Sequence, residues 1–192
     1  MQFEMDTEFG IRTEGMAPDM QVLLEQYPRD AWEVHPGFRD KTRQWLRAHQ
    51  AFRHIAKLLR TDAEALINRS MDPNAYASRL SKRGSSLIGN LHGHHGCEDY
   101  EYFPELSAAD QRFDRGLGVL EKDHQTLDSV LHTFTEIGNR ALKLEQLDDS
   151  KMREEVGKLH QVSETIEEFL DRHLENEEEL AVPIILHHRL RG

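Results

Sequence analysis

The stretch HHGCE at residues 94–98 and the stretch HLENE at residues 173–177 carry the same two functional side chains in the same order. In each stretch a histidine precedes a glutamate by four residues and a proline by ten, Pro104 in the first and Pro183 in the second. Residues four apart on an α-helix lie on one face, one turn from each other. Each stretch therefore predicts a helix that directs an imidazole and a carboxylate to the same side, an arrangement from which helical bundles build metal sites.

Each of these two stretches has a further histidine upstream of it. His49 opens the string HQAF, and His124 opens the similar string HQTL. A phenylalanine precedes each histidine by eleven residues, Phe38 and Phe113 respectively. Eleven residues are about three helical turns, so the phenylalanine and the histidine share a face. A helix with one histidine followed by a helix with His-x-x-x-Glu thus occurs twice, as an internal repeat of about 75 to 79 residues.

This repeated order, His followed by His-x-x-x-Glu, resembles the hemerythrin-like family of non-haem di-iron proteins, whose domain is the HHE cation-binding domain. The resemblance runs from about Pro36 to His188. It implies an all-α fold, an up-down-up-down antiparallel four-helix bundle. We therefore expect residues 1–35 to be an N-terminal extension and residues 36–188 to form the bundle.

The resemblance also implies a set of metal ligands. Each repeat contributes its upstream histidine and the histidine and glutamate of its His-x-x-x-Glu stretch. The six residues that match the family pattern are His49, His94, Glu98, His124, His173 and Glu177.

The register of the first stretch has an alternative, because His95 and Asp99 also stand four residues apart. Pro104 lies ten residues after His94, which is the spacing found in the second stretch. We therefore assign His94 and Glu98 as the ligands. His95 and Asp99 are expected to lie about 100° off the ligand face, with His95 as the alternative to His94.

Two other carboxylates are candidates for a supporting role beside the ligands. Asp128 stands four residues after His124, where oxygen-carrying hemerythrins have a further histidine. Since the repeat equivalent of Asp128 is Arg53, we favour a salt bridge for Asp128 and keep metal ligation as the alternative. Glu101 stands seven residues after His94 and shares its face, so that it is either a pairing residue at the rim or an additional carboxylate of the site.

Four imidazoles and two carboxylates form a mixed nitrogen and oxygen set that suits iron, manganese or zinc. The resemblance implies two iron ions bridged by Glu98 and Glu177, with zinc or manganese as substitutes. A cysteine-rich zinc cluster is excluded, because the chain has a single cysteine. The Glu-x-x-His pairs of ferritin-like di-iron proteins have the opposite order and a shorter spacing, and His-Glu-x-x-His of zinc proteases is absent.

Composition limits the partners and the compartment. The formal net charge of −11 disfavours nucleic acid, whose phosphates need a basic surface. No apolar run approaches the roughly 20 residues that span a bilayer, and the acidic first residues do not form a secretory signal. One cysteine cannot form an internal disulfide. We expect a cytoplasmic protein without a nucleic-acid or membrane partner.

The leading functional hypothesis is a di-iron protein that binds a small diatomic or peroxide ligand. Dioxygen, peroxide or nitric oxide would be bound for sensing, storage or detoxification. One alternative is a di-iron enzyme that decomposes peroxide, so that enzymatic activity stays open at this point. A second alternative is iron handling or the repair of iron–sulfur clusters, although residues 1–35 lack the cysteine that such proteins usually carry near the N-terminus.

Overall fold

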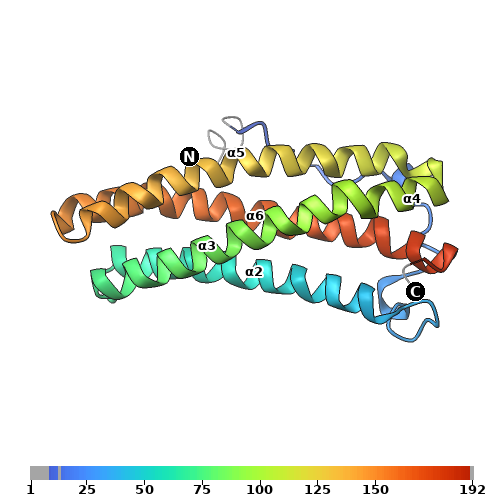
Figure 1. Ribbon diagram of the computed structural model, residues 1–192, viewed down its shortest axis with the longest axis horizontal. Coiled ribbons are helices and arrows are strands. Elements are labelled where there is room, and N and C mark those ends of the chain that lie inside the picture. Colours follow the sequence, from blue (N-terminus) through green and yellow to red (C-terminus); the bar gives the residue numbers. More distant parts are fainter. Residues whose placement is uncertain (1–8, 13, 191–192) are drawn as a thin grey trace.

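The computed structural model describes residues 9–12 and 14–190, which form a bundle of long antiparallel helices (Figure 1). The four long helices are α2 (Asp40–Ile67), α3 (Pro73–Cys97), α5 (Asp114–Leu144) and α6 (Asp149–His188). They run up, down, up and down, and both α3 and α6 contact α2 as well as α5. No strand occurs among the described residues. The predicted all-α four-helix bundle is confirmed.

Capping side chains fix where two of the long helices begin. The carboxylate of Asp72 accepts a hydrogen bond of 3.0 Å from the backbone N–H of Ala75, and Pro73 occupies the first turn of α3. Asp148 accepts a bond of 3.0 Å from the backbone N–H of Lys151 at the start of α6. The connections before α3 and α6 are short, so consecutive helices pack as antiparallel neighbours. Within the described part of the chain, no helix has the length and apolar character needed to cross a membrane.

A π-helical turn, Glu98–Tyr102, joins α3 to the short helix α4 (Phe103–Ala109). A π-turn holds more residues than an α-turn, so the residues after it are rotated relative to a continuous α-helix. Pro104 in α4 is accordingly exposed, whereas Pro183 is buried within the uninterrupted α6. The equal spacing of the two prolines from their histidines therefore does not correspond to an equal orientation.

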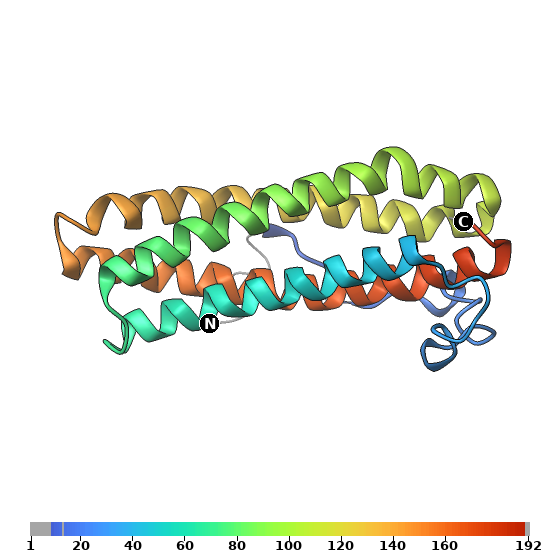
Figure 2. The ribbon, with the colours of Figure 1, turned by 60° about the horizontal axis from the view of Figure 1, so that its bottom comes forward.

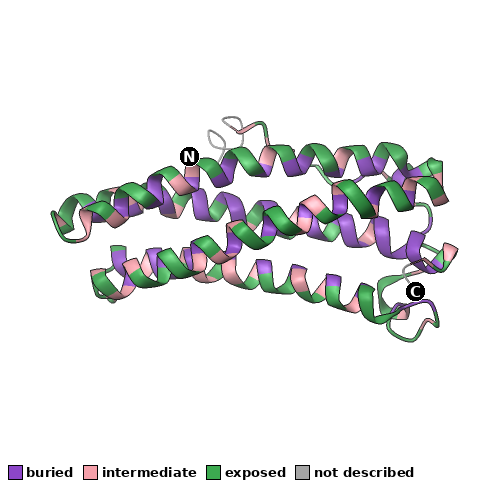
Figure 3. Ribbon diagram, viewed as in Figure 1, coloured by how far each residue is buried: buried purple, intermediate pink, exposed green. Residues whose placement is uncertain are grey.

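The bundle interior contains two hydrophobic clusters with a buried polar layer between them. Figure 3 shows the buried residues as a stripe along the inward side of the helices. Along each long helix the polar layer lies between a residue of the first hydrophobic cluster and a residue of the second, with α4 continuing α3 after the π-turn. The first-cluster residues are Phe52, Leu91, Leu127 and Leu170, and the second-cluster residues are Trp45, Phe103, Leu120 and Leu180. Because apolar side chains close both ends of the layer, the electrostatic interactions inside it are stronger than in water.

The described part of the N-terminal segment packs along the bundle (Figure 2). Phe9 and Ile11 contact the first hydrophobic cluster, whereas Met16 and Met20 are buried in the second. The segment thus passes the polar layer between Ile11 and Met16. The predicted extension, residues 1–35, also contains residues 1–8 and 13, which lie outside the described residues.

Candidate metal centre

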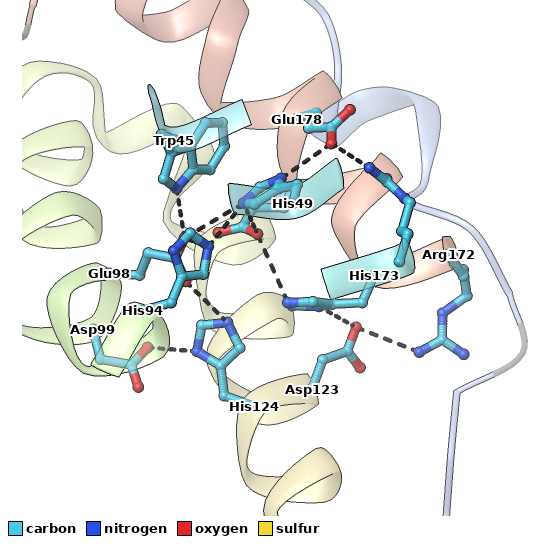
Figure 4. A network of polar contacts seen from close by, with 12 residues as sticks. Trp45, His49, His94, Glu98, Asp99, Asp123, His124, Arg172, His173 and Glu178 are labelled. Carbon is cyan, nitrogen blue, oxygen red and sulfur yellow. Dashed lines mark hydrogen bonds and ion pairs between the residues drawn. The ribbon is translucent and has the colours of Figure 1, made fainter. Parts of the chain in front are cut away.

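All six predicted ligands lie in the buried polar layer, and all four long helices contribute to it (Figure 4). The side chains are His49 from α2, His94 from α3, Glu98 from the π-turn, His124 from α5, and His173 and Glu177 from α6. Four of them are fully buried, and His94, at 11%, has the most exposed side chain of the six. The helical faces predicted from the sequence therefore converge in one place.

His49, His94, Glu98 and Glu177 form one group, in which one ligand atom from each residue lies within 4.8 Å of the others. The Nε2 atoms of His49 and His94 face each other at 2.8 Å. Oε1 of Glu98 lies 2.7 Å from Nε2 of His94 and accepts a hydrogen bond of 2.6 Å from the indole N–H of Trp45. Two imidazoles and two carboxylates thus surround one volume.

His95, His124 and His173 form a second group, whose ligand atoms also lie within 4.8 Å of one another. The ring of His95 stacks on that of His124 with 3.9 Å between centroids and an angle of 8° between the planes. The ring of His173 is edge-on to both, at 5.8 Å from His95 and 4.9 Å from His124. All three side chains are buried.

The two glutamates lie between these groups. The two oxygens of Glu98 reach different groups, since Oε1 contacts His94 and Oε2 lies 3.7 Å from Nε2 of His124. Oε2 of Glu177 lies 3.6 Å from Nε2 of His49 and 3.8 Å from Nε2 of His173. Each carboxylate therefore lies within reach of both histidine groups.

Two further carboxylates hold the outer nitrogens of the upstream histidines. Nδ1 of His49 donates to Glu178 over 3.0 Å, and Nδ1 of His124 donates to Asp99 over 2.8 Å. An imidazole that donates from Nδ1 keeps its lone pair on Nε2, the atom that points into the layer. Burial raises the pKa of Glu178, but the hydrogen bonds that it accepts from His49, Arg29 and Arg53 outweigh burial and lower this pKa to about 2. Glu178 is consequently an ionised carboxylate that accepts the hydrogen bond from His49.

Two arginines of the N-terminal segment contact carboxylates that lie beside the histidines of the layer. Arg12 lies 2.6 Å from Asp123, whose Oδ2 is 3.5 Å from Nδ1 of His173. Arg29 donates to Glu178 over 2.5 Å. Burial raises the pKa of Asp123, but its contacts with His173 and Arg12 outweigh burial and lower it. The segment therefore helps to hold carboxylates that contact the histidines of the layer.

The glutamates between the two groups differ in their tendency to ionise. Burial raises the pKa of Glu98, but hydrogen bonds with His49 and His94 hold it well below its usual range. Burial and the negative charge of Glu98 raise the pKa of Glu177 well above its usual range. A cation between the two carboxylates would favour the charged form of both, because an opposite charge offsets the cost of burial.

The unsatisfied atoms of the layer fit a cation. Several of its polar atoms have no hydrogen-bond partner anywhere in residues 9–12 and 14–190, namely Oε2 of Glu98, both carboxylate oxygens of Glu177, Nε2 of His124, and both ring nitrogens of His95 and His173. Buried polar groups nearly always have partners. Carboxylate oxygen and imidazole nitrogen atoms that converge without hydrogen-bond partners suit iron, manganese or zinc.

The expectation that an offset of about 100° would keep His95 out of the polar layer is wrong. His94 and His95 are about 100° apart on α3, yet His94 reaches the group that contains His49, while His95 reaches the group on the side of α5 and α6. Two adjacent residues can both point inward because α3 faces α2 on one side and α5 on the other. The adjacent histidines of the sequence were a signal for this arrangement, although the spacing of the prolines favoured only one of them as a ligand. Asp99, also placed off the face, contacts His124 from outside.

The two candidate supporting carboxylates do not join the layer. Asp128 is exposed and lies 3.3 Å from Nε2 of His92, a surface contact in line with the pairing role that was favoured. Arg53 instead donates to Glu178 over 2.8 Å. Glu101, in the π-turn, is exposed. The carboxylates that do support the histidines are Asp99, Asp123 and Glu178, none of which was expected in this role.

The fold and the polar layer together define a helical-bundle protein that binds metal cations between facing helices. The family model described as the hemerythrin HHE cation binding domain matches residues 40–185, and the chain belongs to this family. The match includes all six predicted ligands and His95. No curated protein and no solved structure is detectably similar to the chain.

Proposed function

We propose that the protein is a non-haem di-iron protein that binds dioxygen, peroxide or nitric oxide for sensing, storage or detoxification. The observation that carries this proposal is the position of Glu98 and Glu177, because each lies within reach of both histidine groups. A site for a single ion would not need two buried carboxylates that span two sets of imidazoles. The proposal therefore takes two ions for each chain.

The proposed ligands are shared between the two ions. His49 and His94 would hold one ion, His124 and His173 the other, and the two glutamates would bridge them. Iron is the proposed metal, with zinc or manganese as substitutes for the same nitrogen and oxygen donors. A bound iron pair would supply the redox chemistry toward small oxygen and nitrogen ligands.

Burial supports a small ligand. His49, Glu98, His173 and Glu177 are fully buried, and even His94 has a side chain only 11% exposed. A molecule of two or a few atoms could enter such a layer, whereas a large substrate could not do so without helix movement. The formal charge of −11 supports the further proposal that nucleic acid is not a partner. With a single cysteine, we place this function in the cytoplasm.

The test is anaerobic loading with iron(II), followed by metal analysis and optical spectra on addition of dioxygen, peroxide and nitric oxide. Two bound ions and a spectral change that reverses on removal of dioxygen or nitric oxide would support the proposal. The zinc-loaded protein is the control, because zinc has no redox chemistry. Fewer than two ions for each chain, or no spectral response to any of the three molecules, would contradict the proposal.

The same samples separate the two alternatives. Oxygen evolution from peroxide with repeated turnover would indicate a peroxide-decomposing enzyme. Rapid transfer of iron to a metal-free acceptor protein, without a response to the three small molecules, would indicate iron handling.

A further inference from the structure

We infer that His95 is a ligand of the metal ion that His124 and His173 would hold. It reaches this ion from α3 and supplies a third imidazole. The inference rests on the proposed function, because it requires a metal pair in the polar layer. It adds a seventh residue to the six that match the family pattern. It also makes the two metal positions different, with three imidazoles at one and two at the other.

The surroundings of His95 are those of a ligand and not of a core residue. The side chain is buried, and neither ring nitrogen has a hydrogen-bond partner in the part of the chain that the structure describes. An imidazole buried without partners is costly, since a polar group loses its hydration and gains nothing in return.

The repeat shows what this position holds when it is purely structural. Leu174 is the equivalent of His95 in the second repeat, and it is buried in the first hydrophobic cluster. A leucine at position 95 would also pack against the ring of His124 without unsatisfied nitrogens. Stacking at 3.9 Å explains part of the packing of His95, but it does not satisfy the two ring nitrogens.

Helix α5 does not provide this third imidazole at the position one turn after His124. Asp128, one turn after His124, has a side chain that is 58% exposed and is directed to His92 at the surface. His95 instead reaches the volume beside His124 and His173, where the ligand atoms of all three residues lie within 4.8 Å of one another. Three imidazoles form a donor set for one ion, with Glu98 within reach of His124 and Glu177 within reach of His173.

The experiment compares His95→Leu and His95→Gln with the wild-type protein. Leucine reproduces the residue of the second repeat, and glutamine keeps a polar side chain. The matched control is His132→Gln, which removes a histidine with a 75% exposed side chain on α5. Zinc and cobalt(II) affinities are measured by competition with a chelator, and circular dichroism of the metal-free proteins reports folding.

We expect the wild-type protein and the control to bind two ions. Both His95 variants should keep one ion at the wild-type affinity and bind the other at least roughly tenfold more weakly, because loss of a ligand should cost no less than loss of the group that orients one. X-ray absorption of the cobalt-loaded wild-type protein should show five imidazoles for each pair of ions. This last measurement needs no variant, so it decides the matter even if the substitutions prevent folding.

The role of His95 would be overturned if both His95 variants bound two ions with the wild-type affinities, or if the wild-type protein showed four imidazoles for each metal pair. Either result would leave the proposed di-metal centre intact. A wild-type protein that binds no metal pair would instead overturn the proposed function itself and this inference with it.

Discussion

Asp99 and Glu178 are equivalent residues of the two repeats, and each holds a histidine of the other repeat. Asp99, from the first repeat, accepts from Nδ1 of His124 over 2.8 Å. Glu178, from the second, accepts from Nδ1 of His49 over 3.0 Å. The bundle therefore brings the two halves of the chain together through their polar layer as well as through apolar packing. Neither repeat contains a complete site by itself.

Asp99→Asn and Glu178→Gln should each weaken metal binding without unfolding the bundle. The carboxylate orients the imidazole and makes it a better ligand, and loss of such a partner typically costs about tenfold to a hundredfold in affinity. Chelator competition with zinc or cobalt(II) measures the effect. Asp149→Asn is the control, because Asp149 lies at the start of α6 and pairs with Arg153. Equal affinity in all three variants would mean that the outer carboxylates do not tune the site.

Substitution of a bridging glutamate should have a larger effect. Glu98→Ala or Glu177→Ala removes a carboxylate that lies between both histidine groups, so that both ions lose a donor. We expect metal content to fall from two ions to one or none for each chain. His160→Ala is the control, since His160 bonds to Glu64 over 3.2 Å and belongs to neither histidine group. The assignment of the bridges would be refuted by three variants with the same metal content.

Arg12→Gln should loosen the site through Asp123. Arg12 lies 2.6 Å from this buried carboxylate, which in turn lies beside His173. Loss of the guanidinium leaves Asp123 with less compensating charge and frees it to turn away from the imidazole. We expect roughly tenfold weaker binding of one ion and a lower melting temperature.

Arg115→Gln serves as the matched control for this prediction. The ion pair between Arg115 and Asp19, at 2.9 Å, also joins the N-terminal segment to the bundle, but both side chains are exposed. Such a surface pair contributes about 1 kcal/mol or less. If both arginine variants changed metal affinity equally, attachment of the segment would matter more than the contact of Arg12 with Asp123.

The chelator-treated protein should lose stability as the pH falls from 6.5 to 4. Burial lowers the pKa of His173 from 6.5 to about 4, and Asp123 offsets that effect only in part. In this window the unfolded chain takes up a proton on this residue and the folded protein does not. The stability is therefore complete above pH 6.5 and declines toward pH 4, by about 3 kcal/mol for this residue alone.

Chemical denaturation at several pH values would measure this decline. His173→Gln removes the titrating group, so its unfolding free energy should change less between pH 6.5 and 4 than that of the wild type. His132→Gln, at the surface, should follow the wild type. Parallel curves for wild type and His173→Gln would show that the proton uptake of His173 does not contribute.

The repeat and its helical faces could be read from the sequence because they depend on local spacing. Four residues make about one turn of a helix, so His94 and Glu98 share a face wherever the helix lies, and the same holds for His173 and Glu177. The structure gathers these residues in one buried layer, as the repeat predicted.

The tertiary structure alone decided which other residues join that layer. His95 and Asp99 lie off the face of His94, and their roles depend on where α5 stands relative to α3. The contact of Arg12 with Asp123 joins residues 111 positions apart, which no local spacing encodes. The sequence by itself thus determined the long helices and the faces that carry the six candidate ligands, because both follow from helical periodicity. The positions of His95, Asp99 and Asp123 follow from the distances and rotations between packed helices, which exist only in the folded bundle.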